Sequence, residues 1–96
     1  MLENKVADRM GPDDLAAMLR DPARRVVGTK QTLRAAEHGL AVMVIIARDA
    51  EARVTRQLET VCHQRGIPVR EFESMKALGR VCSVEVGAAS AAILRG

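Results

Sequence analysis

A chain of 96 residues has room for one folded domain, and 48% hydrophobic with 28% charged residues is a globular composition that argues against long disorder. Phe72 is the only aromatic residue, so RNA-binding modules that stack bases on several aromatic side chains are excluded. The net charge of +3 does not by itself imply a nucleic-acid partner, but residues 24–38 carry four basic side chains and one acidic one.

The first segment, residues 1–11, has mixed charge and ends at the breaker pair Gly11-Pro12. This pattern predicts a mobile tail before a single domain over residues 12–96. A short helix is expected from Pro12 to Arg20, because proline and acidic residues occupy its first turn and an arginine its last. Its apolar face consists of Leu15, Met18 and Leu19.

A second helix is predicted after an extended run from Arg24 to Val27, with the turn at Gly28-Thr29 and the end near His38. Its inward positions are Leu33 and Ala36, with Leu40 just beyond the helix, and its exposed stripe is Lys30, Arg34 and His38. The positive charge of the chain is therefore expected where it enters this helix.

The start of this helix is the main candidate for a binding site. A glycine and a threonine at a helix entrance leave backbone N–H groups without intrahelical acceptors, and the helix dipole favours an anion there. Lys30 and Arg34 add positive charge beside that end. Two interpretations stay open from these residues: a site for a phosphate-rich partner, or an ordinary capped surface helix with solvated charges.

The continuous β-branched run Ala41 to Ala47 predicts a central strand that is covered on both faces. Asp49 is expected to cap a helix from Ala50 to Arg65, which ends at Gly66. The buried stripe of this helix is predicted to be Val54, Leu58, Val61 and Cys62.

The remaining elements are a strand over Ile67 to Phe72, a brief helix from Met75 to about Val81 capped by Ser74, and a closing strand over Ala88 to Leu94. Strands and helices alternate along the chain. The predicted fold class is therefore α/β, a three-layer α/β/α sandwich with a small mixed, mostly four-stranded sheet.

A loop between the last helix and the last strand holds Val84 and Val86 on either side of Glu85. Apolar residues on a loop usually turn back into the core. The alternative is that they cover a flat surface of a partner, such as an unpaired base.

No group of residues predicts an enzyme. Gly28-Thr29-Lys30 lacks the second glycine of a phosphate loop, and neither histidine has a spacing that pairs it with a nucleophile. Cys62 and His63 have no companion pair at zinc spacing, so we expect no metal, no cofactor and two reduced cysteines, Cys62 and Cys82. We also expect no small-molecule substrate, no membrane span and a cytoplasmic location.

Several stretches, in the same order, resemble a known family: Gly28-Thr29-Lys30-Gln31-Thr32-Leu33-Arg34-Ala35, the strand Val42 to Ala47 with Arg48-Asp49-Ala50, Gly66-Ile67-Pro68-Val69, and Leu78-Gly79-Arg80 with Val84 through Ala89. About residues 13–95 are similar to the kink-turn-binding ribosomal-protein superfamily of the archaeal large-subunit protein L-seven-Ae type, and most closely to its small bacterial YbxF-like branch. The resemblance implies a three-layer α/β/α fold. It also implies binding to kink-turn RNA, a sharply bent duplex with tandem sheared G·A pairs beside a bulge.

By position, the resemblance assigns groove and phosphate contacts to Gly28, Thr29, Lys30, Gln31 and Arg34, bulge contacts to Val84, Glu85 and Val86, and a contact near the backbone to Arg80. Two positions depart from the archaeal pattern. Lys30-Gln31 replace Asn-Glu, and because lysine cannot accept a hydrogen bond from a guanine amino group, the purine contacts must differ in detail. Val86 replaces an arginine, which removes one cation.

Taken with the sequence features, the resemblance implies a non-enzymatic, monomeric protein that stabilises kink-turn RNA and is associated with the ribosome, with ribosomal RNA or a riboswitch as the target class. The alternative is a protein-interaction or assembly module on the same fold that has no affinity for kink-turns.

Overall fold

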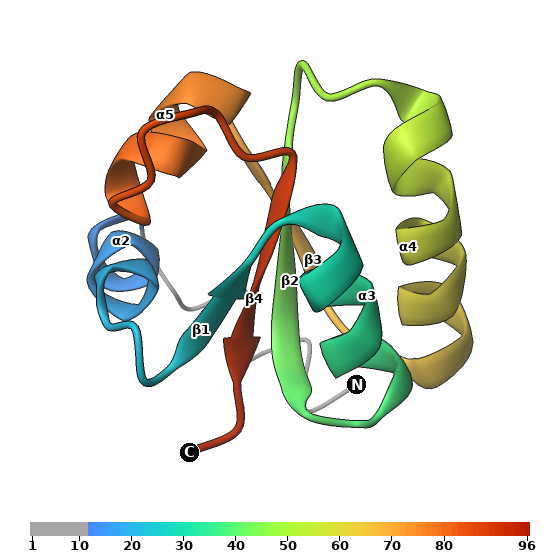
Figure 1. Cartoon of the computed structure of the whole chain (residues 1–96). Helices are drawn as coiled ribbons and strands as arrows, with labels where there is room; N and C mark the ends of the chain where they lie inside the picture. The colour runs from blue at the N-terminus through green and yellow to red at the C-terminus, as the bar shows by residue number, and fades with distance from the viewer. Residues whose placement is uncertain (1–11) are drawn as a thin grey trace.

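A computed structural model describes residues 12–96, with side chains from Asp14 onward, so the tail expected over residues 1–11 lies outside the described range. In chain order the elements are α2 (Pro12–Arg20), β1 (Arg25–Val27), α3 (Thr29–Glu37), β2 (Ala41–Ala47), α4 (Ala52–Arg65), β3 (Val69–Phe72), α5 (Met75–Val81) and β4 (Ser90–Leu94) (Figure 1).

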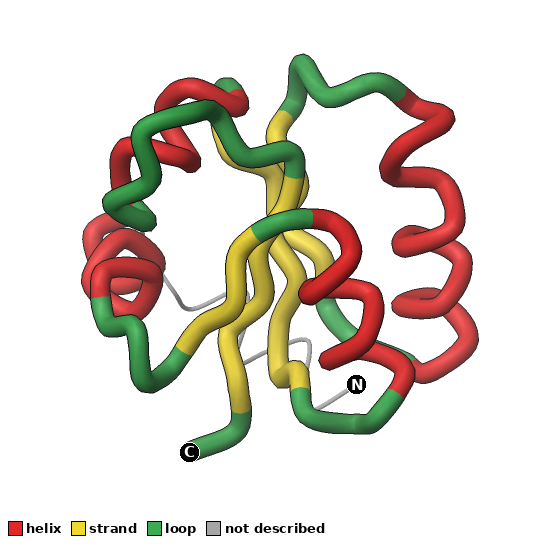
Figure 2. Tube along the Cα trace, in the orientation of Figure 1, coloured by secondary structure: helices red, strands yellow, loops and turns green. Residues whose placement is uncertain are grey.

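The sheet has four strands in the order β1-β4-β2-β3. β4 is antiparallel to both of its neighbours, whereas β2 and β3 are parallel. Figure 2 shows the sheet between two helical layers, with α2 and α5 on one face and α3 and α4 on the other. The predicted three-layer α/β/α sandwich with a mixed, four-stranded sheet is confirmed.

The central strand β2 supplies both cores, because its side chains alternate between the two faces of the sheet. Met43 and Ile45 pack in the cluster beneath α2 and α5, and Val44 and Ile46 pack in the cluster beneath α3 and α4. Val42 is 42% exposed at a register irregularity in the pairing with β4. The expectation of a strand covered on both faces therefore holds for all of β2 except Val42.

Asp49 does not cap the helix that follows it, contrary to prediction. α4 begins at Ala52, and its N-cap Glu51 makes no side-chain capping bond. The Oδ1 atom of Asp49 instead accepts a hydrogen bond of 2.7 Å from the N–H of Met75, the first residue of α5. Ser74 caps α5 as predicted, since its Oγ accepts from the N–H of Ala77 at 3.0 Å. Two oxygens from different parts of the chain therefore cap α5.

Smaller differences concern single side chains and strand ends. Leu40 is 50% exposed and does not join the core, while Thr55 is buried on α4 alongside Leu58 and Cys62. The last two strands are shorter than predicted and begin at Val69 and Ser90.

Cys62 and Cys82 are free and buried, and they lie in the two separate clusters on opposite faces of the sheet. A disulfide between them would have to cross the sheet, so the prediction of two reduced cysteines is confirmed. Within residues 12–96, every helix is too short or too polar to cross a lipid bilayer.

Candidate functional site

The entrance of α3 presents unused backbone donors. Gly28, the N-cap residue, has φ 100° and ψ 149°, a conformation that glycine adopts without steric cost, and no side chain caps the helix. The first helical bond runs from the N–H of Thr32 to the carbonyl of Gly28 at 2.9 Å. The N–H groups of Thr29, Lys30 and Gln31 therefore come before the first intrahelical donor, have no carbonyl acceptor within the helix, and are available to an anion.

This entrance is fixed to the sheet by Ser90, the first residue of β4. The N–H of Gly28 donates to the Ser90 carbonyl at 2.8 Å, and the buried Ser90 hydroxyl donates to the Thr29 hydroxyl at 3.2 Å. The sequence did not indicate this residue, because its partners lie more than sixty positions away. The two bonds place the donors of α3 on a rigid support.

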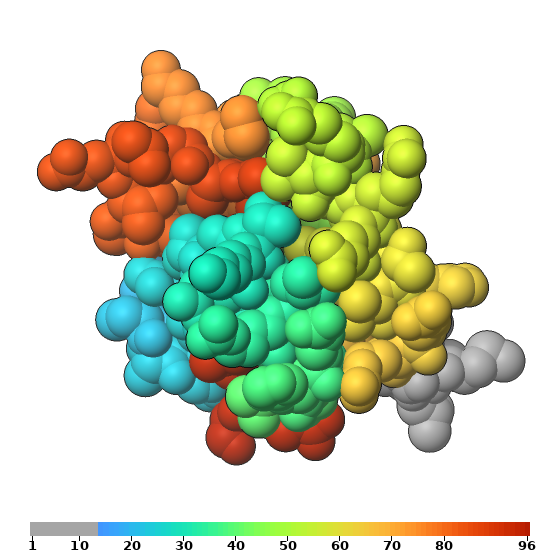
Figure 3. All heavy atoms as spheres, turned by 45° about the vertical axis from the view of Figure 1, so that its right-hand side comes forward, coloured from blue at the N-terminus to red at the C-terminus, as the bar shows by residue number. Residues whose placement is uncertain are grey.

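The exposed face of α3 carries the predicted stripe. Lys30, Gln31, Arg34 and His38 are all exposed, while Thr32, Ala35 and Ala36 are buried against the sheet. In Figure 3, α3 lies in cyan to green on the molecular surface, with the orange to red atoms of α5 and its following loop above and to the left. Figure 3 thus shows α3 and that loop on one face of the molecule.

Two arginines that the sequence placed among the charges at this entrance lie elsewhere. The guanidinium of Arg24 lies beside Gly96, at the end of the chain. The guanidinium of Arg25 donates to the carbonyls of Leu19 and Cys82, at 3.0 Å from Nε and 2.8 Å from Nη2. The expected concentration of charge at the start of α3 is therefore reduced to Lys30 and Arg34.

The predicted bulge-contacting loop begins with a tight reversal at the end of α5. Ser83 has φ 63°, in the left-handed region, and its N–H donates to the Arg80 carbonyl at 3.1 Å. The next N–H, from Val84, donates to the Gly79 carbonyl at 2.9 Å. These two bonds form a Schellman motif, which turns the chain back along α5.

The rest of the loop lies directly on α5. A side chain at Gly79 would place its Cβ 2.5 Å from the Val86 carbonyl oxygen, and one at Gly87 would contact the backbone of Met75. The N–H of Ala88 donates to the Met75 carbonyl at 3.0 Å. The loop is therefore held at both ends and in its middle.

Val86 projects outward from this support and is 75% exposed, whereas Val84 is half-buried and Glu85 exposed. Turning back into the core is therefore the wrong interpretation for Val86, although it partly describes Val84. A shallow hollow of about 260 Å³ lies beside the loop and is lined by Lys76, Arg80, Val84, Glu85, Val86 and Gly87. Lys76, which sequence reasoning missed, faces the same hollow as Arg80 because one helical turn separates them.

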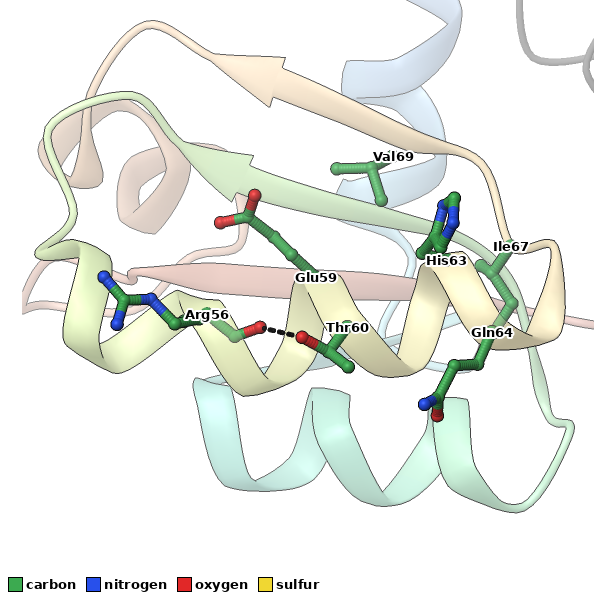
Figure 4. Close-up of a pocket in the computed structure, with 7 residues that line it drawn as sticks. All are labelled: Arg56, Glu59, Thr60, His63, Gln64, Ile67 and Val69. Carbon is green, nitrogen blue, oxygen red and sulfur yellow. Dashed lines mark hydrogen bonds between the residues drawn. The ribbon is translucent and has the colours of Figure 1, made fainter.

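A larger hollow of about 630 Å³ lies between α4 and β3, and its lining consists of Arg56, Glu59, Thr60, His63, Gln64, Ile67 and Val69 (Figure 4). It is an open surface groove in which the Thr60 hydroxyl bonds the Arg56 carbonyl of its own helix at 3.0 Å. Residues 12–96 hold no cluster of three or more His, Cys, Asp or Glu side chains suited to a metal ion.

Comparison with known proteins identifies a family and several relatives of this chain. Residues 14–96 match the model of the Ribosomal protein L7Ae/L30e/S12e/Gadd45 family. An RNA-binding protein of Caldanaerobacter subterraneus subsp. tengcongensis is 45% identical over 71 residues, which are 74% of this chain and 87% of that protein. The RNA-binding protein YbxF of Geobacillus stearothermophilus is 44% identical over 70 residues, 73% of this chain and 85% of its own.

A solved structure with a similar fold is also that of an RNA binding protein. The 15.5kD RNA binding protein of Giardia lamblia superimposes with a TM-score of 0.78 at 29% identity, covering 85% of this chain and 72% of that one. The matched region contains the α3 entrance and the loop on α5, since the family model extends from residue 14 to residue 96. The chain belongs to the Ribosomal protein L7Ae/L30e/S12e/Gadd45 family.

Proposed function

We propose that this protein binds RNA and that it recognises and stabilises the kink-turn. The single observation that carries the proposal is the rigid entrance of α3, where three backbone N–H groups beside Lys30 and Arg34 have no helical acceptor. The relatives named as RNA-binding proteins, at 44–45% identity, support an RNA as the anionic partner.

The α3 entrance is suited to a widened groove of the RNA. Its N–H groups and the helix dipole face the phosphates, and Lys30 and Arg34 neutralise charge along the exposed stripe. Gln31 carries both a donor and an acceptor, so it can accept from a guanine amino group where Lys30 cannot. In this proposal Gly28 and Thr29 shape the entrance, and the purine contacts are shared between Lys30 and Gln31.

The loop on α5 supplies the second contact surface. Val86 offers an exposed apolar side chain on a fixed backbone, which suits the face of an unpaired nucleotide, and Val84 and Glu85 flank it. Arg80 lies in the adjoining hollow, where it is available to a phosphate of the backbone. The bulge of a kink-turn would therefore lie over residues 84–86.

The mechanism is a shift in the population of RNA conformations. A ligand that contacts only the bent geometry stabilises it by the difference in its affinity for the bent and extended forms. We propose ribosomal RNA or a riboswitch as the target class, and a non-enzymatic, monomeric, ribosome-associated protein in the cytoplasm.

A kink-turn duplex labelled with a donor and an acceptor dye at its two ends tests this function. Addition of the protein should shorten the end-to-end distance, and the energy transfer should saturate at one protein per RNA. A duplex with Watson–Crick pairs in place of the sheared G·A pairs is the control. No shortening, or equal affinity for both duplexes, would contradict kink-turn recognition and favour an assembly module on the same fold.

A further inference from the structure

Arg25 connects three elements of the described chain through one side chain. It lies on β1, where it pairs with Ile93 of β4, and its side chain lies on the same face as Val27, which packs in the cluster under α2 and α5. From there its Nε donates to the Leu19 carbonyl at 3.0 Å and its Nη2 to the Cys82 carbonyl at 2.8 Å.

Both acceptors are carbonyls at helix ends. Leu19 lies in the last turn of α2, and Cys82 is the C-cap residue of α5. The last carbonyls of a helix have no intrahelical donor, and a cation is favoured there by the helix dipole. One guanidinium therefore serves the C-terminal ends of two helices at once.

The position of this contact relates the two parts of the proposed RNA surface. Arg25 comes three residues before Gly28, the N-cap residue at the entrance of α3. Cys82 comes directly before Ser83, where the chain reverses direction into the loop that carries Val86. Arg25 is thus a side-chain link between the strand that leads into α3 and the helix end from which the loop departs.

We infer that Arg25 is a positioning residue for RNA binding: its two hydrogen bonds set the place of residues 83–87 relative to the α3 entrance. The inference rests on the proposed function. It does not make Arg25 an RNA contact, since two of its nitrogens are directed to protein carbonyls on the α2 and α5 side, and the side chain is partly buried.

Hydrogen exchange of the free protein tests the link without any RNA. In Arg25→Met, which keeps the aliphatic stem and removes the donors, the amides of Ser83, Val84 and Ala88 should exchange faster than in the wild type. Arg24→Met is the matched control, because its guanidinium lies beside Gly96, and it should leave these amides unchanged. Unchanged exchange of residues 83–88 in folded Arg25→Met would overturn the inference.

RNA titrations over a range of salt concentrations give the second readout. Arg25→Met should weaken binding of the kink-turn by about 3- to 30-fold, the usual range for coupling through intervening contacts, while the salt slope stays that of the wild type. A slope reduced by about one would mean that Arg25 contacts a phosphate directly and would overturn the positioning role.

Arg25→Lys covers the case in which the methionine variant fails to fold. Lysine keeps the cation near both helix ends but cannot span two carbonyls with a planar fork, so it should retain the fold and show an intermediate loss of affinity. Full wild-type affinity and exchange in Arg25→Lys would contradict the inference. If the wild type itself does not bind the kink-turn, the proposed function fails, while the exchange data still decide whether Arg25 holds the loop.

Discussion

Gly79 determines how closely the loop of residues 83–87 can lie against α5. A Cβ there would be 2.5 Å from the Val86 carbonyl oxygen and 3.3 Å from a methyl group of Val84. Because the nearer atom belongs to the backbone, no side-chain rotation can relieve the contact. The exposed position of Val86 thus depends on the absence of a side chain at Gly79.

Gly79→Ala should therefore weaken both stability and RNA binding. We expect the overpacking to exceed the gain in helix propensity, so that the free energy of unfolding falls by about 1–2 kcal/mol in urea titrations. Gly66→Ala is the control, since φ is 68° at Gly66 but no atom lies within 4 Å of an added Cβ. It should cost a similar amount through backbone strain and leave kink-turn affinity unchanged. Equal RNA affinity in Gly79→Ala and the wild type would contradict the role of the loop.

A second prediction concerns Thr32, which is fully buried on α3 with a hydroxyl that makes no hydrogen bond within the described residues. Burying such a group costs free energy, and valine has the same branched shape without the polar atom. Thr32→Val should raise the free energy of unfolding by about 1 kcal/mol, measured by urea titration, with RNA affinity unchanged. Thr32→Ser, which keeps the hydroxyl and loses the methyl group, should lower it; stabilisation by serine instead of valine would be inconsistent with this account.

At the scale of elements, α3 combines a polar entrance with a basic stripe, and these two features make separable contributions to anion binding. Backbone donors are retained in any side-chain variant, whereas the stripe can be removed. Lys30→Ala combined with Arg34→Ala should weaken kink-turn binding and reduce the slope of log K against log salt by up to about two, because each phosphate contact contributes about one counterion.

A charge-matched variant controls for net charge alone. Arg65 is the last residue of α4 and Arg95 follows the last residue of β4, and both are exposed. α4 and β4 both end at the end of the sheet opposite to the α3 entrance (Figure 1). Arg65→Ala combined with Arg95→Ala should leave the salt slope close to that of the wild type. If both double variants reduce the slope equally, the protein binds RNA through its overall charge and not through the α3 stripe.

The elements themselves were largely predictable, because local signals set their limits. The apolar run of β2, the serine before α5 and Gly66 after α4 act within a few residues, and the structure has each of these features where the sequence indicated. The predictions for Asp49 and Arg25 were wrong because the contacts of these residues are not local. Each has a hydrogen-bond partner far along the chain, 26 residues away for Asp49 and 57 for Arg25, and no local pattern encodes such a partner.

For the molecule as a whole, the sequence predicts the layers but not which loops they bring together. The alternation of helices and strands fixes the three-layer order, and the resemblance indicated the residues of the proposed RNA surface. Three residues support that surface: Ser90, Gly79 and Arg25. Their roles became visible only with the structure, because they depend on the pairing of β4 with β1 and β2 and on the packing of the loop against α5. The contact residues of the surface thus remain a prediction, while their rigid support is a property of the fold.

The stability of the whole domain should fall at high pH because of Cys62. Burial, and secondly the negative charge of Glu59, raise the pKa of this thiol from 9.0 to about 11. Between those two pH values the unfolded chain releases a proton that the folded protein retains. The stabilisation is therefore complete below pH 9 and is lost as the pH rises towards 11, by at most about 1.4 kcal/mol per pH unit.

Urea titrations at several pH values between 8 and 11 measure this effect, and Cys62→Ala provides the comparison. Removing the thiol lowers stability at every pH by leaving a cavity, but the decline between pH 9 and pH 11 should be shallower than in the wild type. Burial also raises the pKa of the Cys82 thiol, while the positive charge of Arg25 acts to lower it. Because Cys82 is present in both proteins, its contribution to the pH dependence cancels in the comparison. Parallel curves for the two proteins would show that the Cys62 thiol does not retain its proton in the folded domain.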